Sequence, residues 1–215
     1  MGWSQILDWN QYVKLLVGLF AVVDPLASVP VFLALVQGYS APDRQRVIRA
    51  SVLTFLATLL LFTFFGNNIL GLFAIHIDSL QIAGGLLILL MALDMLRGGE
   101  AEPAATADAA PRQADISVGI VPLAIPFLAG PGAITTILIF ANAYEYVGHR
   151  VVVAVVIGTV AVLIALILRM APMINRVVGG TGMSVFHRVM GLIVAAIAVE
   201  FIIAGLAAHF PTLVR

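Results

Sequence analysis

A carboxylate and two prolines interrupt an apolar run that is long enough to cross a membrane. The run extends from about Val13 to Val36, and Asp24, Pro25 and Pro30 lie near its centre. The apolar core of a bilayer needs about 20 helical residues, and a charge at its centre is costly enough to indicate function. Each proline removes an N–H donor and clashes with the preceding turn. Because broken backbone at this depth must be covered by protein or line a watery cavity, the stretch predicts a polar site at mid-membrane.

A related stretch occurs 101 residues further along the chain. Pro126 and Pro131 follow Pro25 and Pro30 at that offset, and an arginine and a threonine recur at the same spacing. The second copy has isoleucine in place of Asp24. At an offset of 106, an acidic position in the first half also matches one in the second, which pairs Asp94 with Glu200. The chain is therefore predicted to contain two related halves.

Composition places the chain in the bilayer. Its 215 residues are 62% hydrophobic and only 10% charged, whereas a soluble domain carries about 25% charge. The formal net charge is zero, and no basic patch with interleaved aromatics indicates nucleic-acid binding. Cysteine is absent, which excludes disulfides and thiolate chemistry. Residues 1–10 lack a basic region and a cleavage site, so they are not predicted to be a signal peptide.

The predicted fold is an all-α integral membrane protein with six transmembrane helices in two inverted three-helix repeats. Helices 1 and 4 are broken at their proline motifs, and helix 2 begins after Ser40 as N-cap with Pro42 in its first turn. The spans expected from apolar length are 12–37, 42–66, 78–97, 115–141, 149–171 and 184–208. The sequence GNN at 66–68 is expected to end helix 2, with a short re-entrant or interfacial turn over the apolar tail to Ile75 as the alternative. Pro172 is expected to follow helix 5.

A linker divides the chain into two halves, and the positive residues in the loops indicate the orientation in the membrane. Residues 98–115 are rich in Ala, Gly, Pro and acids, so they predict a flexible aqueous segment between repeats at 1–97 and 116–215. Positive loop residues mark the cytoplasmic side of a membrane protein. One side carries Arg44, Arg46, Arg49, Arg97, Arg112, Arg169, Arg176 and Arg188, and the other carries only Lys14, Arg150 and Arg215. We therefore expect a multi-pass protein with a cytoplasmic linker and both termini outside.

The second proline motif predicts an anion site. A helix that restarts at Gly130-Pro131-Gly132 offers free N–H groups and the positive end of its dipole. The glycines would let a ligand approach the backbone, and Thr135 and Thr136 would add hydroxyl donors. The alternative for both threonines is a hydrogen bond to a carbonyl of their own helix.

The first motif predicts a cation or ammonium site at a matching helix restart near Pro30, with Ser28 close by. Asp24 would supply the negative charge, and a small zwitterion such as an amino acid fits both half-sites together. Asp94 and Glu200 are expected to support the two breaks or take part in ion coupling. Plain proline kinks, a buried structural Asp24 and a helix-end pair of Asp94 with Arg97 are the alternatives, and His187 is expected at the cytoplasmic interface.

These residues resemble the MarC family of six-span bacterial membrane proteins. The resemblance covers essentially the whole chain, including an AGG motif at 83–85 that leads to Asp94 and the helix that carries Glu200. The first motif departs from the family pattern at Ala27, where glycine is expected. The motifs that carry the resemblance are Asp24-Pro25 with Pro30, Pro122-x3-Pro126, and Gly130-Pro131-Gly132-Ala133-Ile134-Thr135.

The resemblance implies a secondary transporter of small neutral amino acids such as glycine and alanine, working by alternating access in the bacterial inner membrane. It also implies symport with H⁺ or Na⁺ and no other cofactor. A channel or exporter for another small solute is the alternative. An enzyme is not expected, because no His or Cys is predicted deep in the membrane and no metal-ligand spacing is present. A homo-oligomer is left open.

Overall fold

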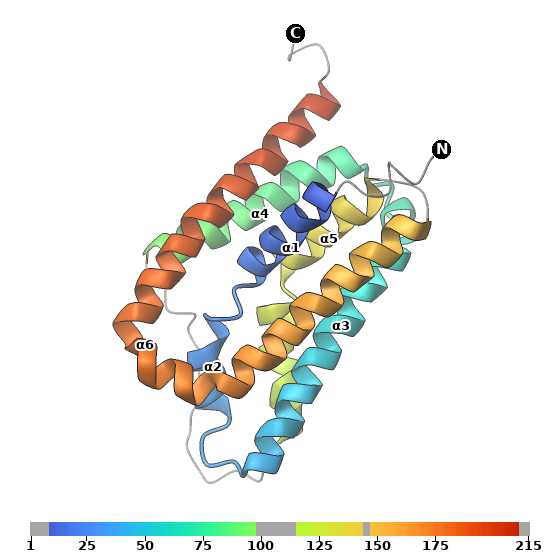
Figure 1. Ribbon diagram of the computed structural model, residues 1–215. Coiled ribbons are helices and arrows are strands. Elements are labelled where there is room, and N and C mark those ends of the chain that lie inside the picture. The colour runs from blue at the N-terminus through green and yellow to red at the C-terminus, as the bar shows by residue number, and fades with distance from the viewer. Residues whose placement is uncertain (1–8, 98–114, 144–146, 211–215) are drawn as a thin grey trace.

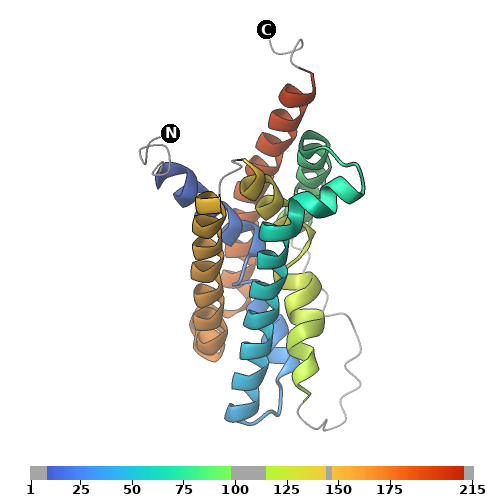
Figure 2. The same cartoon turned by 90° about the vertical axis from the view of Figure 1, so that its right-hand side faces the viewer.

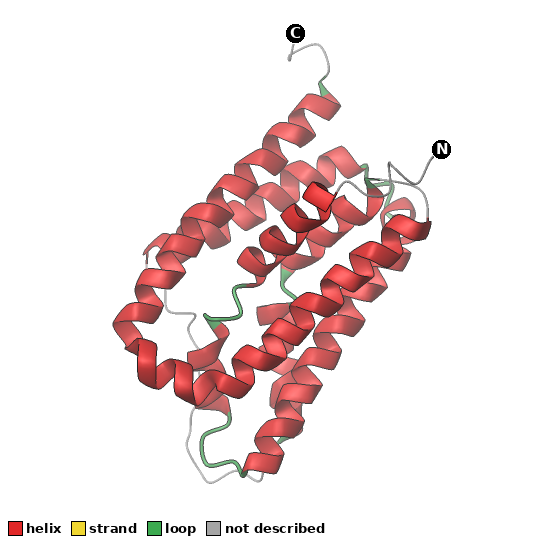
Figure 3. Ribbon diagram, in the orientation of Figure 1, coloured by secondary structure: helices red, strands yellow, loops and turns green. Residues whose placement is uncertain are grey.

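The computed structural model describes residues 9–97, 115–143 and 147–210, and this part of the chain consists of helices joined by short loops, with no strand (Figures 1 and 3). The predicted linker lies almost entirely outside the described residues. A short 3₁₀-helix, η2, and a π-helix, η3, precede α5. The elements are α1 (Trp9–Val23), α2 (Ser28–Leu35), α3 (Ala41–Leu72), α4 (Ile77–Arg97), η2 (Ile116–Gly119), η3 (Ile120–Leu128), α5 (Pro131–Asn142) and α6 (Val147–His209).

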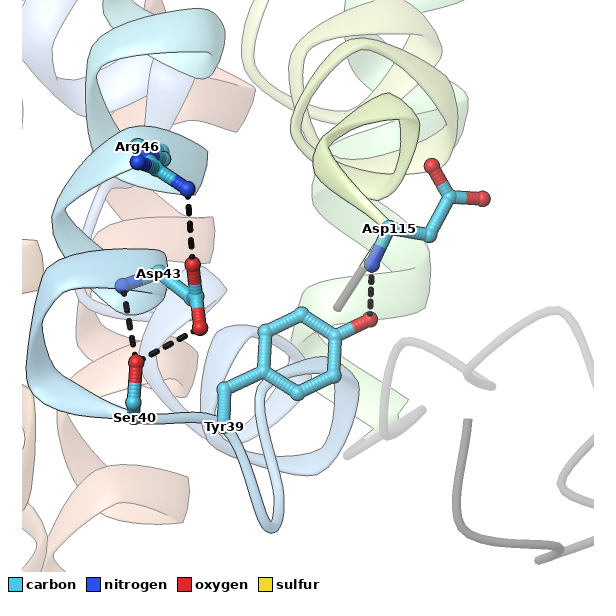
Figure 4. Close-up of polar contacts among 5 residues, drawn as sticks. All are labelled: Tyr39, Ser40, Asp43, Arg46 and Asp115. Carbon is cyan, nitrogen blue, oxygen red and sulfur yellow. Dashed lines mark hydrogen bonds and ion pairs between the residues drawn. The ribbon is translucent and has the colours of Figure 1, made fainter. Parts of the chain in front are cut away.

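The helix α3 begins where the sequence predicts and continues further than it predicts. Ser40 is its N-cap and accepts a hydrogen bond from the Asp43 backbone N–H at 3.3 Å (Figure 4). The expected end at GNN, residues 66–68, is wrong, because the helix continues to Leu72. Gly66 is buried, and a methyl group there would clash with Leu138 of α5. This glycine therefore serves helix packing, which outweighs its weak helix propensity.

The last helix, α6, contains both the fifth and the sixth predicted spans. Its 63 residues would be about 95 Å long as a straight helix, roughly three times the apolar thickness of a bilayer. The helix instead folds back at Gly179, whose φ of 65° is readily available to glycine (Figure 1). We call residues 147–178 the first arm and residues 180–209 the second arm. The predicted end near Pro172 is wrong, since Pro172 lies within the first arm.

Two helices are broken where the sequence predicts. The α1 and α2 helices are separated by residues 24–27 and meet at 49°, and the η2–η3 segment meets α5 at 61° after residues 129–130. Pro30 is the third residue of α2, where its missing N–H interrupts no helical hydrogen bond. In η3, Val121 and Ile125 leave helical geometry because each precedes a proline.

The broken helices lie in the centre of the bundle (Figure 1). Leu19 of α1 and Ile137 of α5 belong to a large core shared with α3 and the first arm. On their other side, Val22 of α1 and Ile139 of α5 belong to a second core shared with α4 and the second arm. The two breaks therefore lie between two layers of long helices, at mid-height in Figures 1 and 3.

The α4 helix and the second arm run antiparallel and approach closely. A methyl group at Gly85 would lie 2.9 Å from the Ala198 carbonyl oxygen, and one at Gly191 would lie 3.1 Å from that of Ala92. Small residues of this kind allow backbones to approach within a membrane. The glycines in this contact, here called the glycine seam, are Gly85, Gly191 and Gly205.

Hydrogen bonds also join the two halves near the ends of the bundle. His149 of the first arm donates from Nε2 to the Phe140 carbonyl at 2.6 Å, and its Nδ1 lies 2.9 Å from the Tyr12 hydroxyl. At the opposite end, the Asp115 backbone N–H donates to the Tyr39 hydroxyl at 3.0 Å (Figure 4). The entry to η2 is thus held against the turn that precedes α3.

Length and composition identify this chain as an integral membrane protein. Among the described residues, α3, α4 and the long segment Gly148–His209 are each apolar enough to span a bilayer. Each of the two bent helix pairs also passes the same test when its parts are taken together, which gives up to five spanning segments.

Candidate functional site

Asp24 occupies a buried and strained position at the first break. The residue is 6% exposed, and its φ of 41° lies in the left-handed region that Asp tolerates better than most side chains. Its backbone N–H ends α1 by donating to the Phe20 carbonyl at 3.0 Å. The Ala27 N–H approaches its Oδ1 at 3.4 Å. The carboxylate therefore lies over the start of α2, whose dipole favours a negative charge.

The second oxygen of Asp24 binds a histidine from the far end of the chain. Nδ1 of His187, in the second arm, lies 2.6 Å from Oδ2 of Asp24, and the two side chains are 21% and 7% exposed. Since a carboxylate oxygen only accepts, we assign a proton to Nδ1 in this pair. His187, expected at the cytoplasmic interface, is instead turned toward the break. Because 163 residues separate the partners, no local sequence pattern could have linked them.

The start of α5 lies against the first break. Gly130 is its N-cap and makes no side-chain capping bond, and Pro131 has no N–H. The N–H groups of Gly132 and Ala133 are therefore the donors that the first turn leaves outside the helical pattern. A methyl group on Gly132 would lie 2.9 Å from Cγ1 of Val22, two residues before Asp24. The positive end of α5 and the buried carboxylate thus share one region of the bundle.

The space beside Gly132 is filled by protein. Ile88 and Met91 of α4, like Val22, would lie within 3.3 Å of an added methyl group. The role predicted for Gly132, close approach of a ligand to its Cα, therefore has a competing explanation in helix packing. At Gly130 the added methyl would meet the Pro126 carbonyl oxygen at 2.6 Å, so this glycine is required by its own turn.

The hydroxyl groups expected at the site differ in their surroundings. Thr136 is 1% exposed and donates to the Gly132 carbonyl at 2.8 Å, which confirms the alternative of a bond within its own helix. Ser28 is fully buried and donates to the Pro25 carbonyl at 2.5 Å, closing the turn after Asp24. Thr135 is 5% exposed and packs against Gly84 of α4.

The prolines of the two motifs differ in exposure. Pro25 is buried within the first break, whereas Pro30, Pro126 and Pro131 are exposed. These prolines shape the breaks, and contact of the exposed ones with a substrate stays a prediction.

The two acids expected to support the breaks are exposed. The Asp94 carboxylate pairs with Arg97 at 3.8 Å, the helix-end pair that the sequence offered as an alternative. Glu200 is exposed on the second arm. Within the described ranges no group of three or more His, Cys, Asp or Glu side chains could hold a metal ion.

Comparisons with known proteins agree with this membrane architecture. Residues 9–210 match the model of a family described as MarC family integral membrane protein. The chain belongs to the MarC family. It is 36% identical to the UPF0056 membrane protein YhcE of Escherichia coli K12 over 97% of both chains. No solved structure matches it.

Other MarC relatives cover the same length. The UPF0056 membrane protein YvbG of Bacillus subtilis is 37% identical over 94% of this chain and 96% of its own. The UPF0056 membrane protein MJ0972 of Methanocaldococcus jannaschii is 36% identical over 92% of this chain and 87% of its own. These names describe membrane proteins and state no substrate, so the site geometry has to carry any argument about function.

Proposed function

We propose that this MarC protein is a secondary transporter of small zwitterionic solutes, of the class of glycine and alanine, driven by an H⁺ or Na⁺ gradient. The observation that carries the proposal is the buried Asp24 carboxylate at one helix break, beside the uncapped start of α5 at the other. A carboxylate attracts an ammonium group, and a helix N-terminus attracts a carboxylate. The two breaks together therefore match the two ends of an amino acid.

The arrangement of elements supports a six-span inverted repeat. Each half consists of a broken helix pair followed by two long apolar segments: α1–α2 with α3 and α4, then η2–η3–α5 with the two arms of α6. In Figure 1, α1 and α2 run down the bundle, whereas η3 and α5 run up it. Transporters with inverted repeats bind substrate near mid-membrane at discontinuous helices and alternate access around that site.

The charge distribution supports an orientation in the cytoplasmic membrane. The start of α1 and the end of α6 lie at the same end of the bundle in Figures 1 and 2. The opposite end holds the turn before α3, whose first turns contain Arg44 and Arg46. By the positive-inside rule we place this arginine-rich end in the cytoplasm and both termini outside.

Uptake into proteoliposomes tests the proposal. Purified protein should accumulate radiolabelled glycine and alanine when a proton or sodium gradient is imposed, and should catalyse counterflow without one. Asp24→Asn should lower the apparent affinity about tenfold or more, since a charge-assisted hydrogen bond contributes about 1.5–3 kcal/mol.

Asp78→Asn is the matched control for Asp24→Asn. Asp78 also binds a histidine of the second arm, His209, at 2.6 Å, but lies in the first turn of α4, away from the breaks. This variant should transport like wild type. Unchanged uptake by a folded Asp24→Asn protein would remove Asp24 from the site, and no uptake or counterflow of any amino acid by the wild type would refute the proposed function.

A further inference from the structure

Both oxygens of the Asp24 carboxylate already face N–H groups. The Ala27 N–H near Oδ1 is backbone and is fixed at the start of α2. The His187 imidazole on Oδ2 is a side chain, and it is the shorter contact at 2.6 Å. A substrate ammonium group that takes the position of the imidazole on Oδ2 displaces a movable side chain, whereas the backbone donor on Oδ1 is fixed.

Asp24 is the one titratable group in the described ranges to which a hydrogen bond or ion pair of the His187 imidazole is seen. The described helices α2, η3 and α5 contain no titratable side chain, and Lys14 of α1 lies ten residues before Asp24. On α4, Asp94 and Arg97 pair with one another in solvent. On the second arm itself, Arg188 follows His187 and is exposed. Of the titratable groups in the described ranges, only His187 is seen within hydrogen-bonding distance of Asp24.

We propose that His187 and the substrate ammonium group compete for Asp24, so that substrate binding releases a proton. This inference rests on the proposed function. In this mechanism the free site pairs an imidazolium at His187 with the Asp24 carboxylate, across the 2.6 Å contact between Nδ1 and Oδ2. When an ammonium N–H takes Oδ2, the Nδ1–H···Oδ2 contact breaks, and the partly buried imidazolium is left without its counter-charge. Such a charge is costly there, so the proton leaves to water and His187 stays neutral.

The competition has a consequence for coupling. A site that holds either the substrate or the proton, and not both, exchanges one for the other across the membrane. The transporter would then use H⁺ as its coupling ion and move it opposite to the substrate. This replaces the symport that the family resemblance implies. His187 is a positioning residue here, since it acts on the substrate through Asp24.

Binding measured against pH tests the inference. Affinity for radiolabelled glycine and alanine is measured on the purified protein in nanodiscs between pH 5 and pH 8, the range in which imidazole changes its charge. Wild type should bind at least ~threefold more weakly at pH 5 than at pH 8, because the proton competes. In a weakly buffered solution, a pH indicator should report protons released on binding.

Two variants locate the effect. His187→Gln keeps an N–H donor but has no titration in this range, so its binding should be independent of pH and release no proton. His209→Gln removes the other histidine that binds an aspartate from the second arm, and it should behave like wild type. Three results would overturn the inference and leave the proposed function standing. They are a pH dependence of binding that persists in His187→Gln, wild-type binding that tightens as the pH falls, and proton uptake on binding.

A measurement on wild-type protein covers the case in which His187→Gln does not fold. The chain has four histidines, which isotope-labelled imidazole NMR can follow. Saturating glycine should shift His187 toward its neutral form at pH 6, and His209 should not change. A His187 signal that glycine leaves unchanged refutes the competition. If wild type binds no amino acid at any pH, the proposed function fails and the inference fails with it.

Discussion

Thr135 occupies a notch in α4 that exists only because residue 84 is a glycine. A methyl group at Gly84 would lie 2.8 Å from Cβ and 2.9 Å from Oγ1 of Thr135, and it would clash with Cγ2. Carbon atoms in contact normally stand about 3.5–4.0 Å apart. In Gly84→Ala, either α5 has to move away or the Thr135 side chain has to rotate. Thr135 lies in the turn that follows the proposed anion site.

The expected magnitude follows from this overlap. Overpacking a filled core costs about 1–3 kcal/mol, and the overlap with three side-chain atoms places Gly84→Ala in the upper part of that range. Helix propensity returns up to about 1 kcal/mol for Gly→Ala. Gly158 isolates that gain, because a methyl group there would meet nothing within 4 Å. Gly158→Ala should thus be neutral or stabilising, while Gly84→Ala should be destabilised by about 2 kcal/mol.

A double-mutant cycle completes the test. Thr135→Ala removes Cγ2 and Oγ1, the two outer atoms that the new methyl would meet, so Gly84→Ala/Thr135→Ala should be more stable than the sum of the single changes by about 1–2 kcal/mol. Thermal unfolding in detergent measures this, with about 2–4 °C per kcal/mol for a chain of this size. Additive single effects, or a Gly84→Ala protein as stable as the Gly158→Ala control, would show that the notch does not hold α5.

Three further changes test other parts of the molecule. Thr135→Val keeps the shape in the notch but removes the hydroxyl, so it should weaken substrate affinity about two- to tenfold. Thr159 is an exposed threonine bonded to its own helix, so Thr159→Val should leave substrate affinity unchanged. Equal effects of the two changes would contradict the proposed site. Ser40→Ala removes the α3 N-cap and should cost about 1 kcal/mol in thermal unfolding; an unchanged midpoint would argue against the cap. Ala105→Cys, outside the described residues, should be labelled only from the cytoplasmic side, and labelling of intact cells from outside would reverse the orientation.

Local chemistry made the broken helices predictable. Each proline removes an N–H donor and clashes with the preceding turn, so Pro25 and Pro126 favour a break, and a buried Asp24 within an apolar run has few structural uses. The cap at Ser40 and the ion pair of Asp94 with Arg97 also depend on neighbours three residues apart, so the sequence indicates them directly.

Long-range packing explains what the sequence did not reveal. Gly66 looks like a helix end, but a leucine of α5 fills the space that a side chain at residue 66 would occupy. Pro172 looks like a stop signal, but the chain reverses seven residues later, at the positive φ of Gly179. His187 looks like a surface residue until the fold of α6 brings it to Asp24. Each of these outcomes depends on a partner that no local window contains.

The glycine seam joins helices from the two predicted repeats, so the rigid units of the bundle are expected to differ from those repeats. Because the backbones approach closely at Gly85 and Gly191, we expect α4 and the second arm to move together as one rigid lever. One half of the chain contributes α4 and the other contributes the second arm. The lever carries His187, while Asp24 stays on the central helices, and a cross-link between α4 and the second arm should leave transport intact. Loss of transport on such a cross-link would place the moving boundary within the seam itself.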